Sequence, residues 1–240
     1  MKRIDGREEN QLREISFELN YVKYAEGSVL VSFGNTKVLC NVTIEESVPH
    51  WMKAQAKPGG WVTAEYAMLP RSTHTRNKRE TKGLKGRTQE ISRLIARSLR
   101  ASVNLEALGQ RSIIVDCDVI QADGGTRTAA ITGGDVALRV ALEGLIKKGE
   151  ITKEVYRANV AAISVGILGD NLLLDLCYEE DVKADVDSNI VMNSDGSLIE
   201  LQATAEGVPF SIEQSNKLVD LAYNGLKDIF KKQQEVLNSL

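Results

Sequence analysis

The sequence has 240 residues, 42% of them hydrophobic and 26% charged, with a net charge of −3, which is ordinary for a globular protein that can bury a proper core. No apolar run approaches the roughly 18 residues of a membrane span, and the polar N-terminus does not have the pattern of a signal peptide. Cys40, Cys117 and Cys177 lie far apart in apolar strand patterns, which indicates a reducing compartment and excludes a disulfide framework or a cysteine-based metal site. We therefore expect a cytoplasmic protein without a membrane-spanning segment.

The first part of the chain predicts mainly strands. Alternating or β-branched runs favour strands at residues 16–22, 28–33, 36–44 and 61–68, and Gly34-Asn35 provides a tight turn for a hairpin between the second and the third. Residues 1–13 and 49–60 show little periodicity and are expected to be irregular.

A basic loop is expected from about residue 70 to residue 86. Between Arg71 and Arg87 there are seven positive charges and one negative charge, Glu80, although the whole chain is mildly acidic. The positive residues are Arg71, Arg76, Lys78, Arg79, Lys82, Lys85 and Arg87. This concentration of charge requires an explanation.

Residues 87–103 have the periodicity of an amphipathic helix. The apolar face contains Ile91, Leu94, Ile95 and Leu99, and a stripe opposite, which we expect to be solvated or to contact another subunit, contains Arg93, Arg97 and Arg100. Arg87 lies at the edge of the apolar face, and an arginine turned toward the core needs a partner. A bound anion and a distant carboxylate explain this position equally well.

A glycine-rich turn follows the strand predicted at residues 112–120. Gly124 and Gly125 form the turn, and a helix then begins at Thr126 or Arg127 and runs to about residue 145, with small residues at steps of three or four that predict close packing. Free N–H groups at a helix start favour an anion, and the guanidinium of Arg127 can bind phosphate or carboxylate. An ordinary turn with an exposed arginine is an equally supported alternative from these residues alone.

The second half of the chain predicts two further hairpins and a long helix. Strands are expected at residues 161–168 and 171–178, around Gly169-Asp170, and at residues 190–192 and 198–204. Ser211 and Gln214 form a capping box for an amphipathic helix that runs to about residue 234. The whole pattern predicts one α+β domain in which helices pack on mixed sheets.

Residues 179–187 are rich in carboxylates. Asp181 and Asp187 lie six residues apart, with Glu180 and Asp185 nearby. Carboxylates at the end of a hairpin can hold Mg²⁺ or Mn²⁺, or one can serve as a general acid, whereas spacing alone favours a solvated acidic loop. The combination of an anion-binding turn, an inward arginine, a basic loop and an acidic segment indicates phosphate chemistry on a nucleic acid.

Five motifs in order resemble the ribonuclease PH family of phosphate-dependent exoribonucleases, over nearly the full length of the chain. They are Arg3-Ile-Asp-Gly-Arg7, Met68-Leu-Pro-Arg-Ser-Thr73 with Arg79-Glu80, Gly86-Arg-Thr-Gln-Glu-Ile-Ser92, Gln121-Ala-Asp-Gly-Gly-Thr-Arg-Thr128, and Leu174-Asp-Leu-Cys-Tyr-Glu-Glu-Asp181 with Asp185-Val-Asp187. The resemblance implies a single α+β domain over residues 1–240, like the second domain of ribosomal protein S5, assembled as a homohexamer that is a trimer of dimers.

The resemblance also implies roles for individual residues. Phosphate would be held by Arg87, Gly125, Thr126 and Arg127, and the RNA backbone would be bound by Arg71, Arg76 and Arg79. Asp181 and Asp187 would form the catalytic pair and hold a divalent cation, Mg²⁺ or Mn²⁺. Asn189 stands where related polynucleotide phosphorylases carry a lysine, which fits the ribonuclease PH branch.

The implied activity is trimming of tRNA precursors and other RNA 3′ ends by inorganic phosphate, the co-substrate, with release of nucleoside diphosphates. One alternative is a non-catalytic RNA-binding ring subunit of an exosome-like complex, although such a subunit need not keep the complete set of site residues. A hydrolytic metal nuclease is a second alternative, but it leaves the anion-binding residues unexplained.

Overall fold

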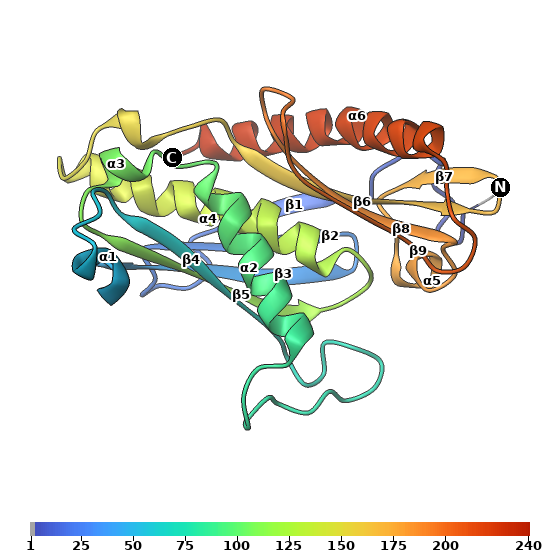
Figure 1. Cartoon of the computed structure of the whole chain (residues 1–240), viewed down its shortest axis with the longest axis horizontal. Helices are drawn as coiled ribbons and strands as arrows, with labels where there is room; N and C mark the ends of the chain where they lie inside the picture. Colours follow the sequence, from blue (N-terminus) through green and yellow to red (C-terminus); the bar gives the residue numbers. More distant parts are fainter. Residues whose placement is uncertain (1–2) are drawn as a thin grey trace.

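The chain forms two β-sheets with helices packed against them in the computed structural model, which describes residues 3–240 (Figure 1). The first sheet has the order β1-β2-β3-β5-β4 and contains β1 (Ile15–Leu19), β2 (Gly27–Phe33), β3 (Thr36–Glu45), β4 (Trp61–Met68) and β5 (Ser112–Gln121). The second sheet has the order β7-β6-β8-β9 and contains β6 (Val160–Leu168), β7 (Asn171–Leu174), β8 (Val186–Asn193) and β9 (Leu198–Ala205). The α+β class predicted from the sequence is therefore confirmed.

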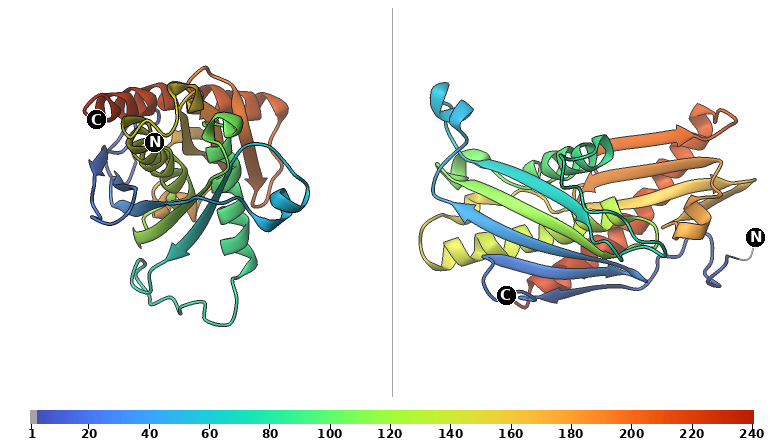
Figure 2. Two further views of the ribbon diagram at one scale, coloured as in Figure 1. Left: turned by 90° about the vertical axis from the view of Figure 1, so that its left-hand side faces the viewer. Right: turned by 90° about the horizontal axis from the view of Figure 1, so that it is seen from below.

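The helices connect and cover the sheets. They are α1 (His50–Ala54), α2 (Gly86–Arg100), α3 (Leu105–Leu108), α4 (Thr126–Lys147), α5 (Tyr178–Asp181) and α6 (Ile212–Leu237), with one short 3-10 turn, η1 (Lys153–Val155). Helix α4 packs against β2 and β3 of the first sheet and against β6 of the second, while α2 packs on β4 and α6 on β6 (Figures 1 and 2). One hydrophobic core consequently includes side chains from both sheets.

The small residues of α4 allow this helix to lie close to the first sheet, as the sequence predicts. A Cβ on Gly133 would overlap the side chain of Val31, and a Cβ on Gly27 would overlap the backbone of α4 at Ala137. Glycines in a helix or strand interior cost stability, and here the close contact offsets that cost. Helix α4 is thus the centre of the core.

The parallel pairing of β4 and β5 positions the functional loops. The other neighbours in the first sheet are antiparallel, and α2 lies in the connection between the two parallel strands. Parallel strands end at the same edge of a sheet, so the loop after β4 and the turn after β5 begin side by side. The N–H of Ala122 indeed donates a hydrogen bond of 2.8 Å to the carbonyl oxygen of Ser72.

Most predicted elements are present, and the differences lie in short segments. Helices α1, α3 and α5 have only four or five residues, too few to produce a recognisable period. The strand expected at residues 171–178 ends at Leu174, because Asp175 adopts a left-handed conformation with φ of 57°. The strand expected at residues 190–192 begins at Val186, which places Asp187 on β8 and not in a loop.

Two further expectations concern α6 and membranes. Ser211 Oγ accepts a hydrogen bond from the N–H of Gln214, whose Oε1 accepts one from the N–H of Ser211, so the predicted capping box is confirmed. Among residues 3–240, no helix combines the length and the apolar character that crossing a bilayer requires.

Candidate active site

One cleft, of about 740 Å³, is lined by residues from both halves of the chain. It lies where the loop after β4, the turn after β5, α5 and β8 meet. All six residues predicted to bind phosphate or to catalyse line this cleft. They are Arg87, Gly125, Thr126, Arg127, Asp181 and Asp187. Segments about 100 residues apart in the sequence therefore form one site, as the motifs predict.

The glycine-rich turn presents the start of α4 to this cleft. Gly125 is the N-cap residue in a left-handed conformation, with φ of 64°, and no side chain caps the helix. The carbonyl oxygen of Gly124 accepts a hydrogen bond of 2.7 Å from Thr36 Oγ1, and that of Asp123 accepts one of 2.6 Å from Arg13 Nη1. The turn is thus fixed by its carbonyl oxygens, while the N–H groups of the first helical turn suit an anion.

Arg87 occupies a different environment from the one predicted. The sequence places it toward the core, but the residue is exposed in the first turn of α2 and its side chain lines the cleft. Helical periodicity fails here because Arg87 precedes the turns that pack on β4. In residues 3–240 no carboxylate lies within ion-pair distance of Arg87, so the distant-carboxylate alternative is not supported.

Arg127 also lines the cleft and is held in place by polar neighbours. Its Nη1 donates a hydrogen bond of 3.2 Å to Gln202 Oε1 on β9 and lies 3.8 Å from Glu90 Oε1 on α2. The guanidinium is largely covered, with 16% of its side chain exposed, so the alternative of a freely exposed arginine is wrong. Arg127 is consequently oriented before any anion binds.

Tyr66 lies beneath this anion-binding region and has no counterpart among the predicted site residues. Its hydroxyl shares a hydrogen bond of 2.8 Å with Thr126 Oγ1. Burial raises the pKa of the Tyr66 phenol, although the hydrogen bond and the charges of Arg87 and Arg127 oppose that effect. The alternation of β4 predicts that Tyr66 faces inward, but only the structure reveals its contact with α4.

The two aspartates predicted to catalyse lie together on the far side of the cleft. Asp181 ends α5 and Asp187 is the second residue of β8. Burial, and then repulsion from Asp181, raise the pKa of Asp187 to about 6, while burial raises the pKa of Asp181. The guanidinium groups of Arg87 and Arg127, which line the same cleft, oppose this rise in pKa for both carboxyl groups.

Other carboxylates of the acidic segment have different environments. Glu179 and Asp185 are exposed, as expected for a solvated loop. Glu180 is buried and accepts hydrogen bonds of 2.8 and 2.6 Å from Arg3 Nε and Nη2. A solvated acidic loop is therefore wrong for Glu180 and Asp187.

Arginines near the N-terminus bond both to the glycine-rich turn and to the segment around α5. Arg13 donates to both carboxylate oxygens of Asp175, at 3.0 and 2.7 Å, as well as to the glycine-rich turn. Asp175 is fully buried, and Arg3 bonds its carbonyl oxygen in addition to the Glu180 carboxylate. The charged pattern of residues 1–13 gave no sign of this role, since arginines are usually exposed.

The glycine-rich turn also touches α5 directly. A Cβ on Gly124 would lie 2.5 Å from the carbonyl oxygen of Leu176 and 2.8 Å from the N of Tyr178, and Gly124 has a φ of 75°. Only glycine fits so close an approach without strain. The glycine-rich turn and the helix that carries Asp181 are thus in backbone contact.

The residues predicted to bind RNA are less tightly grouped. Arg71, Arg76 and Arg79 are all exposed on the basic loop, which extends away from the body of the protein beyond α2 (Figure 1). Arg71 lines a hollow that shares Thr73 and His74 with the cleft, whereas Arg76 and Arg79 do not line the cleft itself. None of the three lines the cleft itself, but Arg71 lies in a neighbouring hollow, and the other two lie further along the loop.

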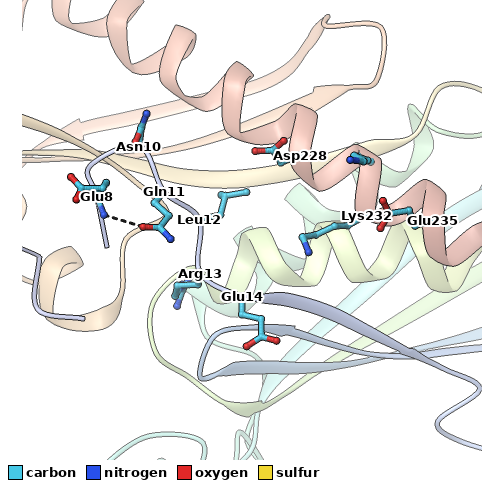
Figure 3. A pocket seen from close by; sticks show the side chains of 10 residues that line it. Glu8, Asn10, Gln11, Leu12, Arg13, Glu14, Asp228, Lys232 and Glu235 are labelled. Atoms are coloured by element: carbon cyan, nitrogen blue, oxygen red, sulfur yellow. Dashed lines mark hydrogen bonds between the residues drawn. The ribbon is translucent and has the colours of Figure 1, made fainter. Parts of the chain in front are cut away.

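A second hollow lies between the N-terminal segment and α6 (Figure 3). Its walls carry carboxylates such as Glu14 and Asp228 together with lysines such as Lys232, so charges of both signs alternate around it. In Figure 3 the side chain of Arg13 points away from α6, in agreement with its bonds to the glycine-rich turn. The hollow has no convergent set of groups comparable with the cleft.

The raised pKa of Asp187 predicts how its replacement changes the free energy of unfolding. A folded-state pKa of about 6, above the ordinary 3.8, means that the folded protein retains a proton that the unfolded chain releases, so the free energy of unfolding falls as pH rises between these values. Without divalent cations, Asp187→Asn should be more stable than the wild type by roughly 1–3 kcal/mol at about pH 7.5 and equally stable at about pH 4.

Urea unfolding at the two pH values measures this difference. The control is Asp195→Asn, in the exposed turn between β8 and β9, which should have little effect at either pH. A stability difference for Asp187→Asn that does not change with pH would contradict the assigned environment.

Family models and known structures match most of the chain. The family model described as 3′ exoribonuclease family, domain 1, matches residues 11–142, and the model described as domain 2 of that family matches residues 158–225. Rice (Oryza sativa) Rrp46 has a similar structure, with a TM-score of 0.80 and 20% identity over 98% of this chain and 100% of that chain.

Two archaeal structures are also similar. The Archaeoglobus fulgidus exosome with RNA bound to the active site gives a TM-score of 0.79 and 22% identity, over 96% of this chain and 92% of that chain. An archaeal exosome core gives a TM-score of 0.75 and 21% identity, over 97% of this chain and 91% of that chain. These likenesses establish the fold, which resembles the second domain of ribosomal protein S5 as the sequence predicts.

Proposed function

The chain belongs to the 3′ exoribonuclease family, and on this basis we propose that it is a phosphate-dependent 3′-to-5′ exoribonuclease that trims the 3′ ends of tRNA precursors. The observation that carries the proposal is the meeting of an anion-binding wall and an acidic pair across one cleft. The anion-binding wall consists of Arg87, Arg127 and the uncapped start of α4. The acidic pair consists of Asp181 and Asp187.

In the proposed reaction, inorganic phosphate lies against the two arginines and the first turn of α4. One of its oxygens attacks the phosphorus of the last phosphodiester in line, the bond to the 3′ oxygen of the preceding nucleotide breaks, and a nucleoside diphosphate leaves. Holding two anions together in this way lowers the entropic cost of the reaction and screens their repulsion. The freed 3′ oxygen takes a proton, which a carboxyl group of the acidic pair can donate because both pKa values are raised.

The acidic pair also fits a divalent cation. Asp187 Oδ1 is buried and has no hydrogen-bond partner in the described part of the chain. No cluster of three or more ligand side chains occurs among residues 3–240, but Mg²⁺ commonly binds through one or two carboxylates together with substrate phosphates. When bound to Asp181 and Asp187, Mg²⁺ or Mn²⁺ would stabilise negative charge on the scissile phosphate.

The proposal is tested by incubating the protein with a 3′-extended tRNA and Mg²⁺, with and without inorganic phosphate. We expect nucleoside diphosphates to appear only when phosphate is present. Release of nucleoside monophosphates without phosphate would instead identify a hydrolytic nuclease.

A non-catalytic RNA-binding ring subunit is the second candidate function. It is favoured by the likeness to two archaeal exosome structures. This candidate predicts tight RNA binding without product release in either condition. We favour the enzyme because the anion-binding residues and both aspartates are present in one cleft.

The basic loop is proposed to bind the RNA backbone, which makes a prediction about salt. Each phosphate contact with single-stranded RNA contributes about 0.7 to the slope of log K against log salt concentration. Replacing Arg71, Arg76 and Arg79 with alanine should therefore lower the slope by about 2. Fluorescence anisotropy over a salt series measures the slope.

A matched control removes the same charge from α6. It replaces three exposed lysines, Lys217, Lys227 and Lys231. Equal effects of the two triple variants would show that the basic loop has no special part in RNA binding.

We also propose that the protein is cytoplasmic, as its cysteine usage suggests, and that it assembles into a homohexameric ring, a trimer of dimers. The resemblance to the ribonuclease PH family and the likeness to exosome core structures support a ring. Light scattering of the purified protein measures its mass directly, and a monomer or a single dimer would contradict the proposal.

A further inference from the structure

The groups described so far recognise phosphates, and none of them accounts for the base of the terminal nucleotide. Of the described residues that line the cleft, His74 and Tyr178 carry rings. Their ring centroids lie 6.3 Å apart with an angle of 51° between the planes. Both residues are exposed, with 49% of the surface of Tyr178 accessible, so their rings are open to a ligand in the cleft.

The position of Tyr178 suits the base of a nucleotide whose phosphate is in the catalytic centre. Tyr178 is the first residue of α5 and Asp181 is the fourth, so the two are three residues apart on one helix. Side chains at this spacing are neighbours, with Cβ atoms roughly 5–6 Å apart. A phosphate beside Asp181 would therefore place its own sugar and base next to the Tyr178 ring.

The backbone of Tyr178 is also fixed before any ligand binds. Its N–H donates a hydrogen bond of 3.3 Å to Asp123 Oδ1, and Gly124 packs directly against its backbone. His74, from the basic loop, lies against the ring on one side. A preorganised ring loses little conformational entropy when it binds a base.

We propose that Tyr178, supported by His74, is a stacking platform for the 3′-terminal base of the RNA. Two rings that sandwich a base must be about 7 Å apart and parallel, because stacked carbon atoms are separated by about 3.5 Å. The tilt and the 6.3 Å separation exclude such a sandwich, so the base stacks on the open face of Tyr178. Stacking on an aromatic ring accepts all four bases, which suits an enzyme that removes successive nucleotides. The inference rests on the proposed function, because it assigns the terminal nucleotide to this cleft.

The test is a double-mutant cycle between the protein and the RNA, measured as binding without phosphate or divalent cation so that no turnover occurs. Two short 5′-labelled RNAs differ only at the 3′ end, where one carries adenine and the other an abasic ribose. The wild type should bind the adenine RNA about tenfold more tightly than the abasic RNA. Tyr178→Leu should bind both RNAs equally, with the affinity that the wild type has for the abasic RNA.

Two further variants control the cycle. Tyr178→Phe keeps the ring and should keep the tenfold preference, whereas Tyr24→Leu, at a residue that is 88% exposed and does not line the cleft, should behave as the wild type. A Tyr178→Leu variant that retains the full preference for adenine would overturn the platform, as would a wild type without any preference. This readout is independent of turnover, so the proposed function fails separately if no nucleoside diphosphate is formed.

Discussion

Replacing Arg87 with alanine should lower phosphate-dependent release of nucleoside diphosphates by about 10²- to 10³-fold, the effect typical of removing one preorganised group that stabilises charge in a reaction. The fold should not change, because Arg87 is exposed and forms no ion pair with the described residues. We expect the free energy of unfolding to change by less than about 0.5 kcal/mol. Steady-state kinetics and urea unfolding of the same preparation measure both quantities.

Arg93→Ala is the matched control for this variant. Arg93 is also an exposed arginine on α2, six residues from Arg87 and consequently on another side of the helix, and it does not line the cleft. It should retain near-normal turnover. If Arg87→Ala and Arg93→Ala were equally active, the proposed phosphate site would be wrong.

Replacing Arg13 with methionine should destabilise the protein by about 3–5 kcal/mol, a large part of the stability of a typical domain. The variant leaves the carboxylate of Asp175 in a fully buried position without its main partner, since Arg7 Nη1 is 3.5 Å away and compensates only in part. It also removes the hydrogen bond that Arg13 donates to the glycine-rich turn at Asp123. Any remaining folded protein should have a raised KM for phosphate.

Arg97→Met provides the comparison. Arg97 forms an ion pair of 2.8 Å with Glu200, but 53% of its side chain is exposed, so breaking that pair should cost no more than about 1 kcal/mol. Urea unfolding of both variants measures the difference. Equal losses of stability would show that the buried Arg13–Asp175 pair is not a special determinant of the fold.

The elements that the sequence predicts well are those with a long period or a strong local signal. Helix α6 begins at its capping box, and the hairpin of β2 and β3 turns at Gly34, because short-range hydrogen bonds and glycine conformations determine these features. The sequence does not predict the end of β7, because an aspartate, Asp175, adopts a left-handed conformation that its buried ion pair with Arg13 holds in place. That pair joins residues 162 apart, and no local pattern contains it.

In the candidate site too, the sequence predicts local features but not long-range contacts. The motifs bring together the glycine-rich turn, Arg87 and the two aspartates. Helical periodicity, however, places Arg87 at the edge of the apolar face, and spacing alone favours a solvated loop for Asp187. No local pattern predicts the roles of Tyr66 and Arg13. Tyr66 contacts Thr126 and Arg13 contacts the glycine-rich turn, and both contacts depend on tertiary packing alone. That residues 1–240 form one domain stays a prediction, which the shared hydrophobic core supports.

The N-terminal segment has a consequence for the protein while it is being made. Arg3 is bonded to Glu180, 177 residues later, and Arg13 to Asp175, 162 residues later, so these side chains receive their partners only after the intervening chain has been synthesised. Contacts so distant in sequence form slowly and late. A nascent chain that has not reached Asp187 contains the anion-binding wall but not the complete acidic pair, so we expect the cleft to form only after this segment has been synthesised.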